Sequence, residues 1–192
     1  MITSDVALKE WAVVAEALGA GEQLLLLRKG GIRDPKGAFQ LEHREFLLYP
    51  TWEHQSEHPE TRVRPEFREC YKKLFTPPSS IQGIPIKVYA GVAYCAPVQD
   101  PQRFAGLEKY HIWTPEFIQE RMKYRPQSPM LAVVLRAYQL KKEILHPVRP
   151  EYAGCKSWVP LSPPLPIGEA VPVVDNQRFR KALEEISGRL EG

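Results

Sequence analysis

Hydrophobic positions follow a helical period near the start of the chain. Residues 5–18 place apolar side chains at i, i+3, i+4 and i+7, after a cap at Ser4 or Asp5 and before Gly19 or Gly21. The apolar set comprises Trp11, Val14, Ala15 and Leu18. The pattern predicts an amphipathic helix that packs one face on a core.

Five other runs are rich in apolar and β-branched residues and are bounded by glycine, proline or polar residues, which predicts strands. They are Leu24–Leu27, Phe46–Tyr49, Ile86–Ala96, Met130–Leu140 and Trp158–Leu161. Pro50 is expected to end the second run, because proline cannot donate a ladder hydrogen bond. Gly91 lies inside the third run, where a glycine often marks a bulge.

Three further helices are predicted from their first residues. One begins at Pro65 and a second at Pro115 with Thr114 as its cap, since proline is favoured at the first helical position. The third follows a cap at Asp175 or Asn176. Its apolar face comprises Phe179, Leu183, Ile186 and Leu190.

The remaining segments lack a regular period. Residues 51–65 are polar and predict an exposed loop, residues 34–37 have the composition of a turn, and the proline-rich residues 162–172 predict a semi-rigid arm. Strands interleaved with helices, without regular βαβ alternation, predict an α+β fold: a small mixed β-barrel decorated by three or four helices. We expect one domain over residues 1–161, with the arm and C-terminal helix of residues 162–192 packed on it.

Composition narrows the class of protein. A chain of 192 residues that is 43% hydrophobic can bury a core without disulfides. Its three cysteines, Cys70, Cys95 and Cys155, have neither zinc-ligand spacing nor an even number, which favours a reducing cytoplasm. No run approaches the roughly 20 apolar residues of a spanning helix, and the first residues do not resemble a signal peptide. We therefore expect a cytoplasmic protein without a membrane partner.

Basic residues mark the candidate ligand site. The net charge is only +3, so the distribution of charge matters more than its total. Arg28 and Lys29 leave a predicted strand into Gly30 and Gly31, whose bare backbone lets a ligand approach closely. This arrangement favours a phosphate contact; the alternative is an exposed basic turn. No glycine-rich nucleotide motif is present, and we expect neither a cofactor nor a metal ion.

Aromatic residues at element ends extend this hypothesis. Trp52, His54 and Trp113 lie where rings can stack on an unpaired or flipped base, and Arg44 is a further candidate for a phosphate contact. The alternative is that the rings cover the core.

A catalytic interpretation would use Lys29 and Glu42 as an acid/base pair of a metal-dependent nuclease or an amidohydrolase. Strand alternation weakens it, because Glu42 and Arg44 would lie on the face opposite His43 and Glu45. We expect binding more than catalysis.

Several blocks resemble the bacterial family known as domain of unknown function 1802 (DUF1802), and the likeness extends over nearly the whole chain. They are residues 8–14, 25–32, 42–51 and 111–114. This resemblance implies no activity, only a link to restriction and defence systems.

A more distant resemblance is to the ASCH branch of the PUA-like barrels. Its ordered blocks match Trp11-Ala12, Gly21, Arg28, residues 91–93, 133–135 and 158–161. In ASCH relatives that hydrolyse acylated cytidines, a Lys, a Thr and a Glu act together. Gln23 and Leu26 stand where the family's Lys and Glu are expected, which weakens an enzymatic role more than a binding role.

Together these patterns predict a nucleic-acid-binding module for DNA or RNA that recognises a modified or unpaired base. The alternatives are an enzyme on the same scaffold and a protein-interaction component that does not bind nucleic acid. The sequence leaves the oligomeric state open.

Overall fold

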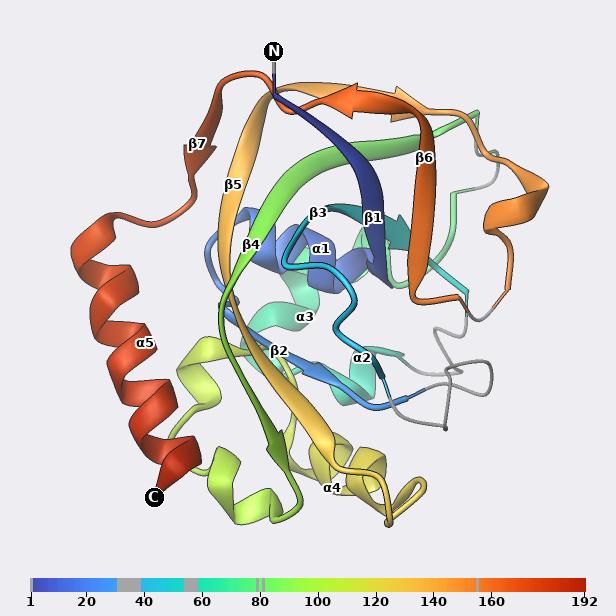
Figure 1. The fold of residues 1–192 in the computed structure, drawn as a ribbon. Helices are drawn as coiled ribbons and strands as arrows, with labels where there is room; N and C mark the ends of the chain where they lie inside the picture. The colour runs from blue at the N-terminus through green and yellow to red at the C-terminus, as the bar shows by residue number, and fades with distance from the viewer. Residues whose placement is uncertain (1, 31–38, 54–58, 79, 81, 155) are drawn as a thin grey trace.

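A computed structural model describes residues 2–30, 39–53, 59–78, 80, 82–154 and 156–192. One mixed seven-stranded sheet has the order β2-β5-β4-β3-β1-β6, and β7 pairs with β5 (Figure 1). The strands are β1 Thr3–Trp11, β2 Leu25–Arg28, β3 Glu45–Thr51, β4 Ile84–Val98, β5 Met130–His146, β6 Trp158–Pro166 and β7 Ala170–Pro172. Only β1 and β3 pair in parallel within this part of the chain.

Five α-helices surround the sheet in the described ranges. They are α1 Ala12–Gly19, α2 Pro59–Arg62, α3 Pro65–Tyr71, α4 Pro115–Lys123 and α5 Asn176–Glu191. The α+β class and the mixed sheet decorated by helices are confirmed. The barrel is loose rather than closed, because β2 and β6 are the two edges of the sheet and no ladder joins them among the described residues. None of the helices described is both long enough and apolar enough to cross a membrane.

The first predicted helix begins too early. Residues 3–11 form β1, and α1 begins only at Ala12, so neither Ser4 nor Asp5 is its cap. β1 lies between β3 and β6 and bonds to both, with Val6 and Leu8 in one core and Ala7 in the other. Sheet pairing on both sides therefore determines the conformation of this segment, and the chain is helical only from residue 12 onward.

Several strands contain prolines, and in β3 and β6 they change the predicted bounds. β3 continues through Pro50 to Thr51, which corrects the prediction that Pro50 ends it. β6 continues through the proline-rich segment to Pro166 as an edge strand, where a missing N–H is tolerated. The predicted domain boundary after Leu161 thus falls within β6.

The other predicted strands and helices form near their expected positions, whereas the exposed loop predicted at residues 51–65 is wrong where α2 and the buried Val63, which bridges Trp113, lie. β4 and β5 are longer than predicted, and their register shifts between Val92 and Tyr94, close to Gly91. Thr114 and Asp175 cap α4 and α5 by accepting backbone N–H groups, as predicted. The turn expected at residues 34–37 lies outside the described residues.

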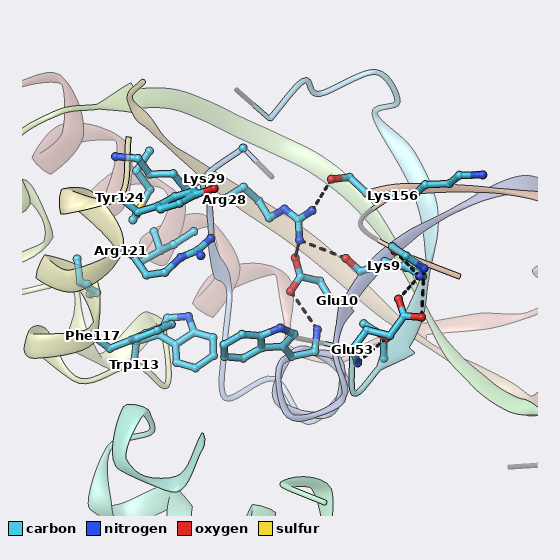
Figure 2. Close-up of a pocket in the computed structure, with 18 residues that line it drawn as sticks. Lys9, Glu10, Arg28, Lys29, Glu53, Trp113, Phe117, Arg121, Tyr124 and Lys156 are labelled. Atoms are coloured by element: carbon cyan, nitrogen blue, oxygen red, sulfur yellow. Dashed lines mark hydrogen bonds and ion pairs between the residues drawn. The ribbon is translucent and has the colours of Figure 1, made fainter. Parts of the chain in front are cut away.

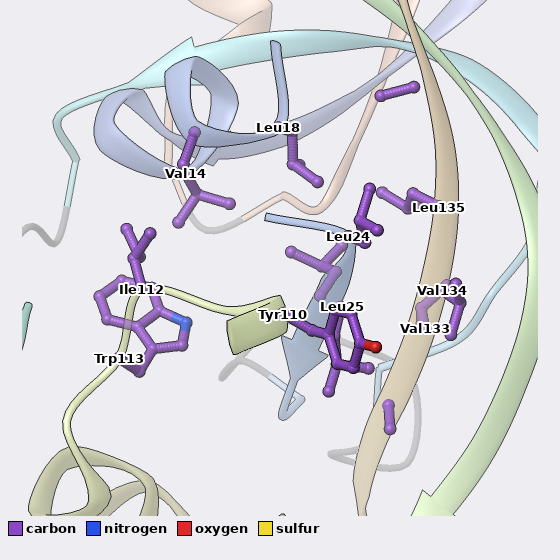
Figure 3. Packing of buried hydrophobic residues seen from close by; sticks show 14 of the residues in the cluster. Val14, Leu18, Leu24, Leu25, Tyr110, Ile112, Trp113, Val133, Val134 and Leu135 are labelled. Atoms are coloured by element: carbon purple, nitrogen blue, oxygen red, sulfur yellow. The ribbon is translucent and has the colours of Figure 1, made fainter. Parts of the chain in front are cut away.

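Two hydrophobic cores fill the two faces of the curved sheet. The larger contains α1, which lies inside the curve, together with residues from α4 and α5 (Figure 1). Leu24 and Leu25 of the β2 region belong to this cluster and lie below Leu18 of α1, while Ile112 and Trp113 lie below Val14 (Figure 3). The smaller core lies on the opposite face and includes Leu47 and Val159. The larger core fixes the ends of β1 and β2, where a cavity opens.

Candidate ligand-binding cavity

A cavity of about 290 Å³ lies where the ends of β1 and β2 meet α4 (Figure 2). Its size is close to the lower limit of typical small-molecule pockets, which suits one planar group rather than a folded ligand. The lining residues are Lys9, Glu10, Trp11, Leu27, Arg28, Lys29, Gly30, Thr51, Glu53, Trp113, Phe117, Ile118, Arg121, Tyr124, Met130, Gly154, Lys156 and Ser157.

Arg28 joins the two edges of the sheet across this cavity. From the end of β2 it donates to the Glu10 carboxylate, to the Lys9 carbonyl at 3.2 Å and to the Ser157 hydroxyl at 2.8 Å. Lys9 and Glu10 belong to β1, and Ser157 precedes β6. The guanidinium therefore links β2 to β1 and to the start of β6, and β2 pairs with neither strand in the described sheet. Its carbon also lies 4.6 Å from the centroid of the Phe39 ring. Side chains thus close the seam that the backbone leaves open.

Lys29 lies in the cavity wall rather than in solvent. Its ammonium donates to the Met122 carbonyl at 2.8 Å, and only 5% of the residue is exposed. Burial lowers the Lys29 pKa, and the nearby Arg121 charge lowers it further. Burial and the positive charge of Arg121 therefore both disfavour the charged form of the Lys29 amine.

Arg121 of α4 is the cation whose charge is least compensated. Burial and the charges of Arg28 and Arg62 lower its pKa, although Glu10 opposes them. Among the described residues its guanidinium has neither a hydrogen-bond acceptor nor an ion-pair partner. Arg121 lies on the α4 side of the cavity, across from Arg28 and Glu10 (Figure 2). A partly buried cation without a described partner favours the binding of an anion.

The two other lysines of the lining, Lys9 and Lys156, have hydrogen-bond acceptors within the protein. Lys9 donates to Glu53 at 2.6 Å and to the Gly154 carbonyl at 3.0 Å. Lys156 donates to the Glu151 carbonyl at 2.9 Å. Lysine and arginine side chains outnumber carboxylates five to two along the lining, so the cavity as a whole favours an anionic ligand.

Aromatic rings form the other wall. Trp11 and Trp113 meet edge to face at 5.4 Å, and Phe117 lies 4.7 Å from Trp113. Trp113 is only 6% exposed and serves mainly as wall, whereas Trp11 is half-buried and Tyr124 is 41% exposed. The more accessible rings are therefore Trp11 and Tyr124.

Two supports hold Trp113 in place. It forms a β-bridge with Val63, and its backbone N–H donates to Nδ1 of His111 at 3.2 Å. His111 is 1% exposed, and burial, reinforced by the Arg64 charge, lowers its pKa to about 4. His111 is therefore a neutral acceptor at physiological pH.

The structure gathers half of the residues predicted for the site. Arg28, Lys29, Gly30 and Trp113 all line the cavity, whereas Gly31 and His54 lie outside the described residues. Arg44 and Trp52 do not join the described lining.

Their positions have a simple structural reason. Arg44 is exposed just before β3, where its carbonyl accepts from Val92 of β4. The Trp52 indole donates to the Leu74 carbonyl at 3.1 Å and lines a different cavity, beside α1. Thr51 and Glu53 line the candidate cavity while Pro50 and Trp52 line the other one, so alternation along the chain turns Trp52 away, and Arg44 lies before the opposite end of β3.

The proposed acid/base pair is not assembled. Lys29 is buried in the cavity wall, while Glu42 is exposed and contributes nothing to the described lining. The carboxylates that do line the cavity are Glu10 and Glu53, and each is already paired with a cation.

Sequence reasoning missed Glu10, Trp11 and Arg121 as site residues. The helical period predicts a helix over Glu10 and Trp11, whereas both residues lie at the end of β1. Arg121 lies in the last turn of α4, where a basic residue is commonplace because it favours the helix dipole. No local signal separates it from a surface arginine.

Fold and cavity together define an α+β protein with a cationic, aromatic-lined pocket at the seam of an open mixed sheet. The chain belongs to the family described as domain of unknown function (DUF1802), whose model matches residues 7–185. A comparison with curated proteins finds no match.

Solved structures show a loose likeness to ASCH proteins of Zymomonas mobilis. One such structure is 12% identical with a TM-score of 0.41, covering 94% of this chain and 93% of that chain. A serine-to-alanine variant is 14% identical with a TM-score of 0.40, covering 84% of this chain and 92% of that one. A likeness this loose does not identify a ligand.

Proposed function

We propose that this protein binds nucleic acid and takes one unpaired base into the cavity at the sheet seam. The observation that carries the proposal is the Arg121 guanidinium, which is partly buried and lacks a described partner beside accessible aromatic rings. A phosphate supplies the missing negative charge, and Trp11 or Tyr124 offers a face for stacking.

The cavity's dimensions support an unpaired base. A volume of about 290 Å³ admits one base, so a base within a duplex would have to leave its stack to enter. Single strands present such bases without the cost of unstacking and unpairing. Binding is therefore expected to favour single-stranded over double-stranded nucleic acid.

Arg28 has a different part in this proposal from the one predicted. Its guanidinium already donates hydrogen bonds to Glu10, Lys9 and Ser157, so Arg28 supports the cavity wall. Arg121 is therefore the main candidate for the phosphate contact. Lys29 in the wall and Lys156 on the lining add positive potential to the cavity.

The test is binding of fluorescein-labelled single- and double-stranded DNA and RNA at several salt concentrations. We expect salt-dependent binding to single strands. The logarithm of the association constant should fall with the logarithm of the salt concentration, with a slope of about 0.7 for each phosphate contact. Arg121→Gln should weaken binding and reduce the slope by about one contact.

Lys123→Gln is the matched control, since Lys123 is exposed on the same helix and does not line the cavity. Its affinity should equal that of the wild type. Absence of binding, or binding without a salt slope, would overturn the proposal. Equal effects of the two variants would show that only general surface charge is involved.

A further inference from the structure

We infer that Glu10 selects the base: the cavity takes bases that carry an exocyclic amino group, with the Glu10 carboxylate as the acceptor. This inference rests on the proposed function and adds a specificity-determining residue to it. The juxtaposition behind it is a buried, fixed carboxylate in an otherwise cationic and aromatic cavity.

The Glu10 carboxylate is held firmly in one orientation. Its Oε1 accepts from Arg28, and its Oε2 accepts from the backbone N–H of Trp11 at 3.3 Å. Its side chain is 7% exposed, so it cannot turn out to solvent without leaving both donors. Figure 2 shows Glu10 beside Arg28, with a dashed line joining the carboxylate to the guanidinium.

The carboxylate retains unused acceptor capacity. Two oxygens offer about four lone-pair sites, and the described chain supplies two donors. An ionised carboxylate in an ion pair accepts hydrogen bonds and cannot donate them. It therefore attracts an amino N–H and repels a carbonyl or bare ring nitrogen placed against it.

Trp11 connects this acceptor to the stacking surface. Glu10 and Trp11 are consecutive at the end of β1, and the Trp11 ring forms part of the aromatic wall. A base stacked on that wall presents its edge, rather than its face, to a neighbouring side chain. Glutamate accepting from a base amino group is an established mode of recognition.

The sharpest test removes the amino group without adding atoms. Single-stranded oligonucleotides of deoxycytidine are compared with the same lengths of 2-pyrimidinone deoxyriboside, and deoxyadenosine with unsubstituted purine deoxyriboside. We expect the wild type to bind each amino-bearing strand about tenfold more tightly than its partner, because a hydrogen bond to a charged acceptor is lost.

Glu10→Gln tests the residue itself. Arg28 requires an oxygen, so the amide nitrogen takes the place of the other carboxylate oxygen and turns an acceptor into a donor. The tenfold preference should fall to about one or reverse. Glu143→Gln is the control, because Glu143 is an ion-paired carboxylate on β5 outside the cavity, and the preference should survive.

The outcomes separate the two proposals. If no strand binds, the nucleic-acid function itself fails. If all strands bind with a salt slope but equally well, the function stands and the role of Glu10 is overturned. Should Glu10→Gln fail to fold, equal binding of amino and amino-free strands by the wild type still overturns the inference.

Discussion

At the scale of the residue, two arginines in one cavity carry the same charge and differ in their surroundings. Arg28 is surrounded by acceptors from β1 and by Ser157, so its charge is compensated within the protein. Arg121 is partly buried near other cations, without a described partner. The sequence favours Arg28 because glycines follow it, yet availability for a ligand depends on unmet hydrogen-bonding capacity, which only the fold sets.

His111 gives a prediction about pH. Its pKa in the folded protein is about 4, against 6.5 for an ordinary histidine, chiefly because it is buried. The unfolded chain therefore binds a proton that the folded protein excludes between these two values. Stability should be full above about pH 6.5 and should fall by about 3 kcal/mol as the pH drops to 4.

The measurement is urea unfolding of the wild type and His111→Asn between pH 7 and pH 4. Asparagine keeps an acceptor for the Trp113 N–H but does not titrate in this range. The stability difference between the two proteins should shrink steadily as the pH falls. His146, whose pKa burial also lowers, contributes equally to both curves. A constant difference would contradict the assignment to His111.

At the scale of the element, α4 determines whether the cavity wall is in place. Its cap, the Thr114 hydroxyl, accepts from the Phe117 N–H at 3.3 Å, and the helix carries Phe117 and Arg121 into the cavity. Thr114→Ala should destabilise the protein by about 1 kcal/mol and weaken nucleic-acid binding severalfold, because the first turn loses its anchor.

Asp175→Ala is the comparison for that prediction. Asp175 caps α5 by accepting from the Arg178 N–H at 2.8 Å, and α5 lies beside β4 and β5, away from the cavity lining (Figure 1). Thermal unfolding should show a lower melting temperature in both variants. Binding should weaken only in Thr114→Ala; equal loss in both would mean that global stability, not α4, governs affinity.

The same elements show what a sequence can and cannot predict. The caps at Thr114 and Asp175 act within three residues, so local chemistry identifies them. β1 is different: its conformation depends on β3, about 40 residues later, and on β6, about 150 residues later. Local periodicity extended the helix into this segment because the pairing partners are distant in sequence.

At the scale of the whole molecule, the cavity exists because the sheet curls without closing. β2 and β6 remain separate edges in the described structure, and Arg28 connects β2 with β1 and the residue before β6. No motif in the sequence relates Arg28 to Glu10 or Ser157, since their spacing carries no period. Most strand segments could be predicted from the sequence. The contacts of Arg28 with Glu10 and Ser157, which bring β2 and β1 together at the cavity, could not.

We predict that the Arg28–Glu10 ion pair contributes to stability as a coupled unit. Arg28 and Glu10 are largely buried, with side-chain exposures of 18% and 7%. Arg28→Met leaves the Glu10 charge without its partner and should cost about 3–5 kcal/mol of stability. Arg28→Met combined with Glu10→Leu removes both charges, so much of that loss should be recovered even though the Lys9 carbonyl and Ser157 lose a donor.

Denaturant unfolding of the two single variants and the double variant measures the coupling. Lys141→Met is the control, because Lys141 pairs with Glu169 at 2.8 Å on the surface, and its loss should change stability by less than about 0.5 kcal/mol. The double variant should fold yet bind nucleic acid poorly, since the cavity has lost its fixed acceptor. If the single effects simply add, the two edges of the sheet are held together by packing alone, and the seam is not a coupled unit.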